Sequence, residues 1–538
     1  MLTGEIGGLP PDLLAAAVAL LEELTAISSD SGDAGGLGRM AARLAAMLAA
    51  RGLEVEVRQG VAGGGGGPEA TPPRGVAGAS EPAAGAPAGD RGALPVVLAR
   101  GPNRRAAARG RGHLLLIGHF DTVLPAAPPR RCGEPGERSA RLVATGAIDM
   151  KGGLATLAGA LDLLAQRGVA PPDDLLVVAV PDEEVGGELS RAAVARWGAG
   201  ARALWVLEPG APGDGPGAET LVGGRRGLFD WRLEAHGKSA HSGLHLAGGR
   251  SALLAAARWC LAAAGVRGDT ALAQGDDAAP QLAGHAAAHA GDEAGQPTSA
   301  ATGSRGRPAV NVGRLVAGDA SFVGNLAAAQ ALLGTYRQLN VVPDSAVAEG
   351  EARFSTVGAG EETARRLAEL AATIGAGTGT SLVFTRGPVI PPVDPGGPQR
   401  AWCQRAVALA AARGWCLEVE EERGGISFPN FLPDPGRLPV LDGLGPIGGG
   451  MHTRDEFVDL TSFARRIVLL ADLLQAEAEV DAQYERAYAG VSRTRSGMTS
   501  KDGRKRAYGP PREPGRGMAL HLLVTRQAPA GARALDRK

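Results

Sequence analysis

Histidines and carboxylates in this sequence stand where they could bind metal ions. His119 ends the apolar run HLLLIGH, and Asp121 lies two residues later, on the same side of a strand. A histidine that ligates a metal commonly donates its other ring nitrogen to such a carboxylate. A lone HxD pair is more often structural, so this pair needs support from other residues.

Acidic residues supply that support. Asp182, Glu183 and Glu184 follow the apolar run LLVVAV, and Asp149 lies in GAIDMKGG just before a predicted helix. Three adjacent carboxylates at the end of a buried strand repel one another and lose hydration, so they need cations or solvent. Taken singly, the triplet could be a solvated turn and Asp149 a helix cap.

Two further residues complete the set. Glu208 ends the apolar run ALWVLE, and His452 lies far downstream in PIGGGMHTRDE. Neither is notable alone. Together with the residues above they provide two histidines and several carboxylates, which suffices for two ions such as zinc bridged by one carboxylate.

The elements that carry these residues alternate between strands and helices. This order predicts an α/β sheet covered by helices on both faces, with reactive groups at the carboxyl ends of the strands. The predicted strands are 53–59, 95–100, 113–119, 175–180 and 203–208, and the predicted helices are 10–27, 36–52, 151–168 and 188–198.

A second pattern begins near residue 226. Strands are predicted at 229–237, 308–318, 346–355 and 381–386, with helices at 248–264 and 361–375. This βαββαβ order is typical of a small ferredoxin-like α+β domain. An additional helical segment at 321–338 interrupts it. After about 390 the first pattern returns and ends with a helix at 461–478, so the small domain is inserted into the larger one.

The predicted domain organisation follows from these patterns. We expect a catalytic domain in two parts, 1–225 and 391–480, a lid or dimerisation domain at 226–390, and a basic, disordered tail at 481–538. The segments 61–112 and 268–307 are rich in Gly, Ala and Pro or Asp, bury little apolar surface, and are expected to be largely disordered inserts.

Composition narrows the classes of function. The 538-residue chain has a formal net charge of −1, but residues 486–538 carry 13 Lys or Arg against 3 Asp or Glu. A basic run without a fold is more often a solvated end than a nucleic-acid site, so nucleic-acid binding is not expected. Four dispersed cysteines indicate reduced, buried thiols. Without a signal peptide or an apolar membrane span, a soluble, cytoplasmic protein is expected.

Six stretches resemble one known family. GHFDTV, GAIDMKGG, PDEEVGG, LEPG, GKSAHSG and GGGMHTRDEFV occur in family order over about 20–478. They are similar to the co-catalytic zinc amidohydrolases that include acetylornithine deacetylase, succinyl-diaminopimelate desuccinylase, carboxypeptidase G and the aminoacylases. The resemblance implies a zinc-peptidase-like domain with a mixed sheet flanked by helices, interrupted by a lid domain.

The resemblance also implies roles for individual residues. Two Zn²⁺ ions, replaceable by cobalt or manganese, would share Asp149 as a bridge. Asp121 would orient one ligand, and the Asp149–Met150 peptide bond would be cis. Glu183 would act as general base and then general acid on the leaving nitrogen. One metal would take His119, Asp149 and Glu208, and the other Asp149, Glu184 and His452.

The small domain contributes further residues by the same resemblance. His241, with His245 as a rival, would reach the partner subunit's active site in a homodimer and hydrogen-bond the developing oxyanion. Asn340 and Arg353 would bind substrate, with the guanidinium gripping a carboxylate. Phe428 departs from the family, which has Asp there, so the neighbouring pocket is expected to differ.

These observations predict a hydrolase that cleaves the amide bond of an N-acyl amino acid or short peptide with a free carboxylate. The alternative from another class is a catalytically silent metal-binding or scaffold protein on the same fold. The motifs specify chemistry but not the acyl group or the amino acid. The small-molecule substrate therefore stays open at this stage.

Overall fold

A computed structural model of the chain describes residues 8–60, 94–101, 112–133, 140–265, 306–327 and 340–497, with the backbone alone at 325–327 and 481–497. The chain divides into two compact units, Met1–Asp481 and Ala482–Lys538. The elements below belong to the first unit, apart from the end of α9, which extends beyond Asp481. Most of the predicted inserts, part of the 321–338 segment and the tail from 498 lie outside the described residues.

A six-stranded mixed sheet forms the centre of the larger fold. Its order is β1(Glu54–Gly60), β2(Leu94–Arg100), β6(Leu175–Val180), β3(His113–His119), β7(Ala201–Val206) and β15(Val440–Leu441). The four strands from β6 to β15 are parallel, and β2 runs antiparallel to both of its neighbours, β1 and β6. The central residues of the parallel strands β6, β3 and β7 are apolar and buried because both faces of the sheet are covered.

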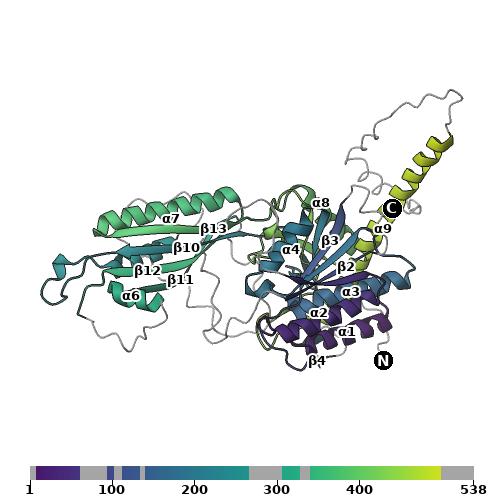
Figure 1. Ribbon diagram of the computed structural model, residues 1–538, viewed down its shortest axis with the longest axis horizontal. Helices are drawn as coiled ribbons and strands as arrows, with labels where there is room; N and C mark the ends of the chain where they lie inside the picture. The colour runs from purple at the N-terminus through teal and green to yellow at the C-terminus, as the bar shows by residue number, and fades with distance from the viewer. Residues whose placement is uncertain are drawn as a thin grey trace, which may run out of the picture. The chain divides into compact units, whose positions relative to one another are not determined.

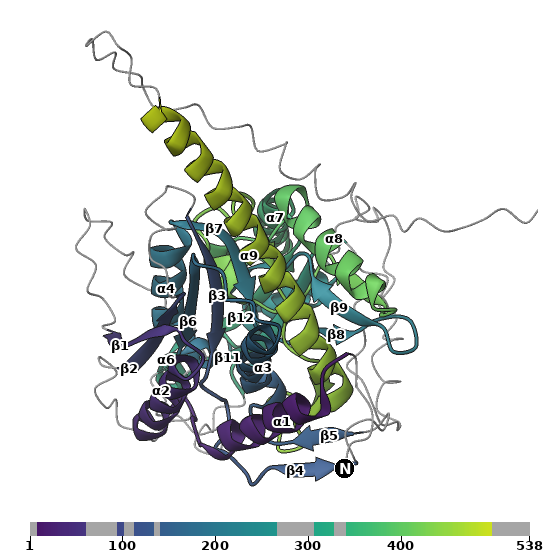
Figure 2. The ribbon, with the colours of Figure 1, turned by 90° about the vertical axis from the view of Figure 1, so that its right-hand side faces the viewer.

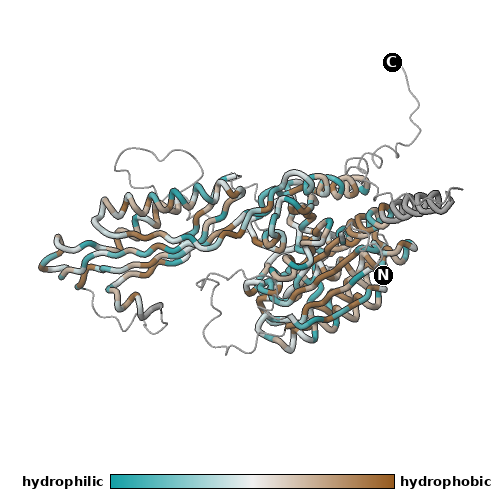
Figure 3. Tube along the Cα trace, turned by 45° about the horizontal axis from the view of Figure 1, so that its top comes forward, coloured by the Kyte–Doolittle hydropathy of each residue, from teal (hydrophilic) through white to brown (hydrophobic). Residues whose placement is uncertain are grey.

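Helices supply that cover. They are α1(Pro11–Ala26), α2(Ala34–Ala49), α3(Gly152–Gln166), α4(Glu188–Gly198), α8(Gly397–Ala412) and α9(Leu460–Gly497) (Figure 1). Figure 2 shows α9 beside α3, where Ile467 packs closely on Gly159. The strands are among the most hydrophobic segments in Figure 3. One continuous core therefore lies between sheet and helices.

Two small sheets border the central one. One consists of β14(Leu417–Glu420), β9(Glu219–Val222) and β8(Ala211–Pro212), and the other of β16(Gly448–Gly449), β17(Phe457–Asp459), β5(Arg141–Val143) and β4(Arg130–Cys132). The sequence patterns missed these strands because each has only two to four residues, too few to show a period. They matter because β5 and β16 lead into the segments that carry Asp149 and His452.

A separate four-stranded antiparallel sheet matches the predicted small domain. Its order is β11(Ala309–Gly318), β12(Ser345–Phe354), β10(Gly227–His236) and β13(Ser381–Ile390). Burial alternates along β10, and α5(Ala252–Ala264) and α7(Val357–Thr378) pack on the buried face. Figure 1 shows α7 running along β13. The short helix α6(Ala320–Ala327) lies in the segment predicted to be helical.

Some predicted boundaries were wrong. Helix α5 begins at Ala252 rather than 248, because the Ser251 side chain accepts a hydrogen bond from Leu254 N and caps the helix there. Helix α9 continues to Gly497, into the segment expected to be disordered from 481, because no Gly or Pro interrupts residues 479–489. All four cysteines are free, but Cys132 and Cys416 are exposed, not buried as expected.

Candidate metal centre

Three adjacent parallel strands place the first ligand candidates at one edge of the sheet. His119 is the last residue of β3, Asp182 to Glu184 follow β6, and Glu208 lies two residues beyond β7. Since β6, β3 and β7 are neighbours, their carboxyl ends meet. The apolar runs that end in these residues therefore converge on one site, as the alternation of strands and helices predicts.

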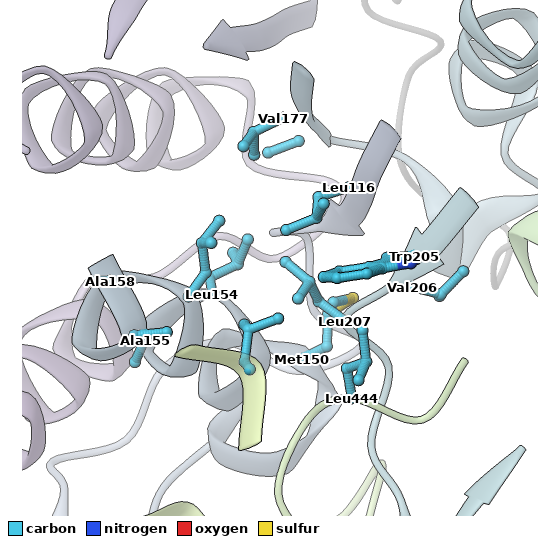
Figure 4. Close-up of a cluster of buried hydrophobic side chains, with 14 of the residues drawn as sticks. Leu116, Met150, Leu154, Ala155, Ala158, Val177, Trp205, Val206, Leu207 and Leu444 are labelled. Carbon is cyan, nitrogen blue, oxygen red and sulfur yellow. The ribbon is translucent and has the colours of Figure 1, made fainter. Parts of the chain in front are cut away.

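Asp149 comes from the turn between β5 and α3. The Asp149–Met150 peptide bond is cis, as the resemblance implied. Met150 is buried, and Figure 4 shows it among Leu207, Leu444 and Leu154. Its sulfur accepts a hydrogen bond from the backbone N–H of His119 at 3.1 Å. The turn is thus packed directly under the end of β3.

Asp149 lies between the two histidines. Its Oδ1 is 3.1 Å from Nε2 of His119, and its Oδ2 is 3.4 Å from Nε2 of His452. Glu184 Oε2 is 3.3 Å from the same His452 nitrogen, and Glu208 Oε1 is 3.8 Å from the His119 nitrogen. One ligand atom each of His119, Asp149 and Glu184 lie within 4.8 Å of one another. The structure therefore brings all five predicted ligands together.

His452 approaches from a tight turn after β16. It has a φ of 63°, a left-handed conformation that non-glycine residues rarely adopt outside turns and functional sites. Thr453 N donates to Gly450 O at 3.0 Å and closes the turn. The His452 side chain is 53% exposed, whereas that of His119 is 1% exposed. The cluster consequently opens towards solvent on the His452 side.

The charges in the cluster exceed what two histidines can balance. Burial, reinforced by Asp149, raises the pKa of Glu208 to about 7. Burial also raises the pKa of Glu183 well above its ordinary value, and Glu208 and Glu184 raise it further, against the opposing effect of His119. Hydrogen bonds to Asp149 and Glu184 raise the pKa of His452 to about 10. Such a site favours the binding of cations.

The pKa values of His119 and Asp149 also show that the site favours positive charge. Burial alone lowers the pKa of His119, but hydrogen bonds to Asp121 and Asp149 outweigh it and raise that pKa well above 6.5. Burial tends to raise the pKa of Asp149, but hydrogen bonds from His119 and His452 dominate and lower it. Positive charge close to Asp149 is therefore strongly favoured.

Sequence comparison identifies the family. Residues 115–476, about two thirds of the chain, match the profile of peptidase family M20/M25/M40. The chain belongs to this family. It is accordingly a metal-dependent hydrolase of the peptidase and carboxypeptidase type, as the resemblance implied, with the corresponding catalytic and lid folds.

Individual relatives support the assignment. The chain is 26% identical to carboxypeptidase G2 of Pseudomonas sp. (strain RS-16) over 386 residues, which covers 70% of this chain and 77% of the relative. Aminopeptidase PepT from Bacillus cereus is 18% identical with a TM-score of 0.58, over 87% of this chain and 99% of that one. The dinuclear metal-binding peptidase YXEP from Bacillus subtilis is 14% identical with a TM-score of 0.51, over 87% and 99%. These structures share the fold.

Asp121 lies behind the candidate ligands of this M20 peptidase. It is fully buried, and its Oδ1 lies 3.2 Å from Nδ1 of His119. Its two oxygens also accept hydrogen bonds from the backbone N–H groups of Glu183 and Glu184, each at 3.1 Å, and from Ser31 Oγ at 2.9 Å. One carboxylate thus fixes His119 and the backbone of the acidic triplet.

Three contributing residues were missed by sequence reasoning. Ser31 donates to Asp121, as above, and Ser427 Oγ donates to Glu208 Oε1 at 3.2 Å. Glu456 is buried and accepts hydrogen bonds from the backbone N–H groups of Gly146, Ile148 and Asp149 at 2.8 to 3.1 Å. Glu456 lies in the stretch GGGMHTRDEFV, which could have drawn attention to it. Neither serine carries a sequence signal of comparable strength.

The predicted substrate residues lie elsewhere in the fold. His241 and Asn340 are exposed and adjacent, because Ser242 N donates to Asn340 O at 2.9 Å and His241 pairs with Val341. Arg353, on β12, donates to both oxygens of Glu351 and to Gly424 O. Among the described residues, no contact joins any of these three to the metal cluster.

The departure at Phe428 has a clear structural role. Its ring is fully buried and lies 6.5 Å from the His119 ring, centre to centre, at an interplanar angle of 44°. An apolar side chain there covers one side of the His119 ring. Among the described residues, no helix is long and apolar enough to cross a membrane.

Proposed function

We propose that this M20 chain binds two Zn²⁺ ions and hydrolyses the amide bond of an N-acyl amino acid or short peptide with a free carboxylate. The observation that carries the proposal is the placement of Asp149, whose two oxygens face different histidines. A carboxylate placed in this way suits a bridge between two ions. His119 and Glu208 would complete one site, and Glu184 and His452 the other.

The donor set fits the proposed metal. Imidazole nitrogens and carboxylate oxygens without thiolates suit zinc, and cobalt or manganese would also bind them. The excess negative charge and the raised pKa values of Glu183 and Glu208 supply the electrostatic reason for two divalent ions. Bound together, such ions lower the pKa of a water between them and polarise an amide carbonyl.

Glu183 is the proposed general base. Its backbone N–H is held by Asp121, in the loop that also positions Glu184, yet none of the ligand contacts above uses the Glu183 carboxylate. That carboxylate would accept the proton of the attacking water. It would then deliver the proton to the leaving nitrogen as the C–N bond breaks, so it acts first as base and then as acid.

The substrate class rests on Arg353 and on the relatives. A guanidinium recognises a carboxylate through paired hydrogen bonds. Arg353 holds Glu351 in that paired manner, with Nε and Nη2 donating at 2.8 and 3.2 Å, and a substrate carboxylate would compete for the same edge. The relative carboxypeptidase G2 is by name a carboxypeptidase, which agrees with a free carboxylate on the substrate. Asn340 is proposed as a second substrate contact.

We also propose that the chain is a homodimer in which His241 completes the partner's active site. Leu254 and Leu261, one heptad apart on α5, are 61% and 65% exposed, and Leu244 and Leu246 lie exposed near His241. An apolar patch of this kind is typical of a protein interface. The corresponding domain division is a catalytic domain at 1–225 and 391–480 and a lid at 226–390. Full activity in a strictly monomeric enzyme would contradict the role of His241.

The decisive experiment replaces the proposed base. Glu183→Ala should retain two zinc ions per chain and lose at least 100-fold in kcat, because general catalysis contributes about 10²–10⁴-fold. Turnover would be measured on a panel of N-acetyl, N-succinyl and dipeptide substrates with zinc or cobalt. Arg58→Ala, which removes an exposed ion pair with Glu56, is the control. Near-normal turnover of the zinc-loaded Glu183 variant would refute the assignment, and a wild type inert on every substrate would favour the silent scaffold.

A further inference from the structure

We propose that the Ser427–Phe431 turn, comprising Ser427 and the 3₁₀ helix η8(Phe428–Phe431), positions the metal ligand Glu208, with Ser427 as the positioning residue. The inference rests on the proposed two-metal site. It adds a determinant that none of the family-like motifs contains. The turn lies about 219 residues from Glu208 along the chain, yet the two meet in the core.

The direct contact is a buried hydrogen bond. Ser427 Oγ donates to Oε1 of Glu208 at 3.2 Å, and both residues are buried. The same Oε1 is the oxygen that lies 3.8 Å from Nε2 of His119. A hydrogen bond to one carboxylate oxygen fixes the rotation of the carboxylate, and partners of this kind tune metal affinity strongly. Ser427 therefore determines which oxygen Glu208 presents to the cluster.

The turn itself is rigid. Asn430 Oδ1 accepts from Ser427 N at 3.1 Å, and the Ser427 side chain accepts from Asn430 N, which together form a capping box. Asn430 N also donates to Ser427 O at 3.0 Å. Phe428, the next residue, packs beside the His119 ring. The Ser427 hydroxyl is consequently held by backbone and side-chain contacts on both sides, and it has little freedom to leave Glu208.

The turn also forms hydrogen bonds with the two segments through which the chain enters and leaves the lid sheet. We call these segments the lid crossings. Asn430 Nδ2 donates to Arg226 O at 3.1 Å and to Pro391 O at 2.9 Å. Arg226 directly precedes β10, and Pro391 directly follows β13. One asparagine side chain therefore joins the Ser427–Phe431 turn to the chain entering and the chain leaving that sheet.

A buried ion pair holds the segment before the turn. Arg225 Nε donates to Asp442 Oδ2 at 2.6 Å, and its Nη1 donates to Gly425 O at 3.0 Å. Arg225 itself pairs with Val393 and Arg423 as isolated β-bridges. Breaking a buried ion pair is costly, so this anchor keeps the segment in register with the crossings. The metal ligand and the lid crossings thus share one rigid support.

The test measures metal binding by the full chain after removal of bound metal. Ser427→Ala should weaken the zinc site that contains Glu208 by about 10- to 100-fold and leave the other site within about threefold of wild type. Ser427→Thr keeps the hydroxyl and should restore most of that affinity. Affinities would come from calorimetric titration with Zn²⁺, and geometry from the visible absorption of the Co²⁺ form.

Thr25→Val is the matched control, because it removes an equally buried hydroxyl that bonds only within α1. It should lower the free energy of unfolding without changing either metal affinity. Wild-type affinities in Ser427→Ala would overturn the positioning role, as would an equal loss of affinity in Thr25→Val. Failure of the proposed function itself is distinguishable, because the wild type would then bind fewer than two ions.

Discussion

Asp121 serves four partners with two carboxylate oxygens. Its Oδ1 meets His119 Nδ1 and Glu183 N, and its Oδ2 meets Glu184 N and Ser31 Oγ. Three of these partners, two backbone N–H groups and the Ser31 hydroxyl, donate hydrogen bonds to the carboxylate, and His119 Nδ1 also lies 3.1 Å from the backbone oxygen of Asp121. Asp121 therefore does more than orient the His119 imidazole. It also holds the backbone of the loop that carries the proposed base, Glu183.

Asp121→Asn should weaken zinc binding by about 10- to 100-fold and lower kcat as well. The asparagine amide replaces one of the two carboxylate oxygens with an NH₂ group. Because NH₂ is a donor, it repels at least one of the four groups that contact these oxygens. Zinc affinity by calorimetric titration and kcat at saturating zinc would be measured together. Wild-type values for both would contradict the role.

Asp174→Asn offers a control for that substitution. Asp174 is also a buried carboxylate, but it directly precedes β6 and pairs with Arg202 at 2.6 Å, at the strand end opposite the acidic triplet. Its loss should destabilise the fold without changing zinc affinity. The comparison separates an effect on the metal site from a general loss of a buried charge.

At the scale of elements, the junction between α3 and β7 determines how closely Asp149 approaches the sheet. A Cβ on Gly153 would lie 1.9 Å from Leu207 O, so the helix can begin there only with glycine. At Gly118 an added Cβ would lie 2.5 Å from Cε of Met150, the end of a flexible side chain that can move aside more easily than a backbone oxygen. These two close approaches bring the turn that carries Asp149 against β3 and β7.

Gly153→Ala should lower the free energy of unfolding by about 1–3 kcal/mol or more, because the helix must move off the strand. Urea unfolding of the metal-free protein would measure it. Gly38→Ala, in α2 with no atom near the added Cβ, is the opposite-sign control and should stabilise by up to about 1 kcal/mol. An unchanged unfolding free energy in Gly153→Ala would show that the contact is relieved without cost.

The sequence predicted the strands and the residues that gather at their ends, but not the contacts that hold those residues. Strands β3, β6 and β7 are recognisable because their apolar, buried runs end in or shortly before ionisable residues. Ser427 and Glu456 act on partners 219 and more than 300 residues away, and no periodicity links such distant positions. The two-residue strands β15 and β16 are likewise too short to leave a pattern. Local sequence thus identifies the residues of the cluster, whereas tertiary packing defines what holds them.

At the scale of the whole molecule, the buried apolar residues form two separate hydrophobic cores. One core fills the space around the central sheet, and the other lies under the lid sheet around Trp231 and Trp259. The aromatic pair has ring centres 4.9 Å apart in an edge-on arrangement. The five ligand candidates all belong to the larger fold, at the edge of the first core. Metal binding should therefore stabilise that fold first.

Removal of metal should lower the stability of the larger fold markedly. The native cluster gathers four carboxylates, Asp149, Glu183, Glu184 and Glu208, around two histidines, and the unfolded chain does not. Ions that bind only the native state stabilise it by about 2.7 kcal/mol per site at 100 times the Kd. Urea unfolding with and without chelator should give free energies of unfolding that differ by at least that amount, with an unchanged dependence on urea concentration.

In His452→Ala the chelator effect should fall by about half, because one site loses its histidine while the other keeps His119. Equal stability of the metal-free and zinc-loaded wild type would show that the cluster does not bind zinc in the native state.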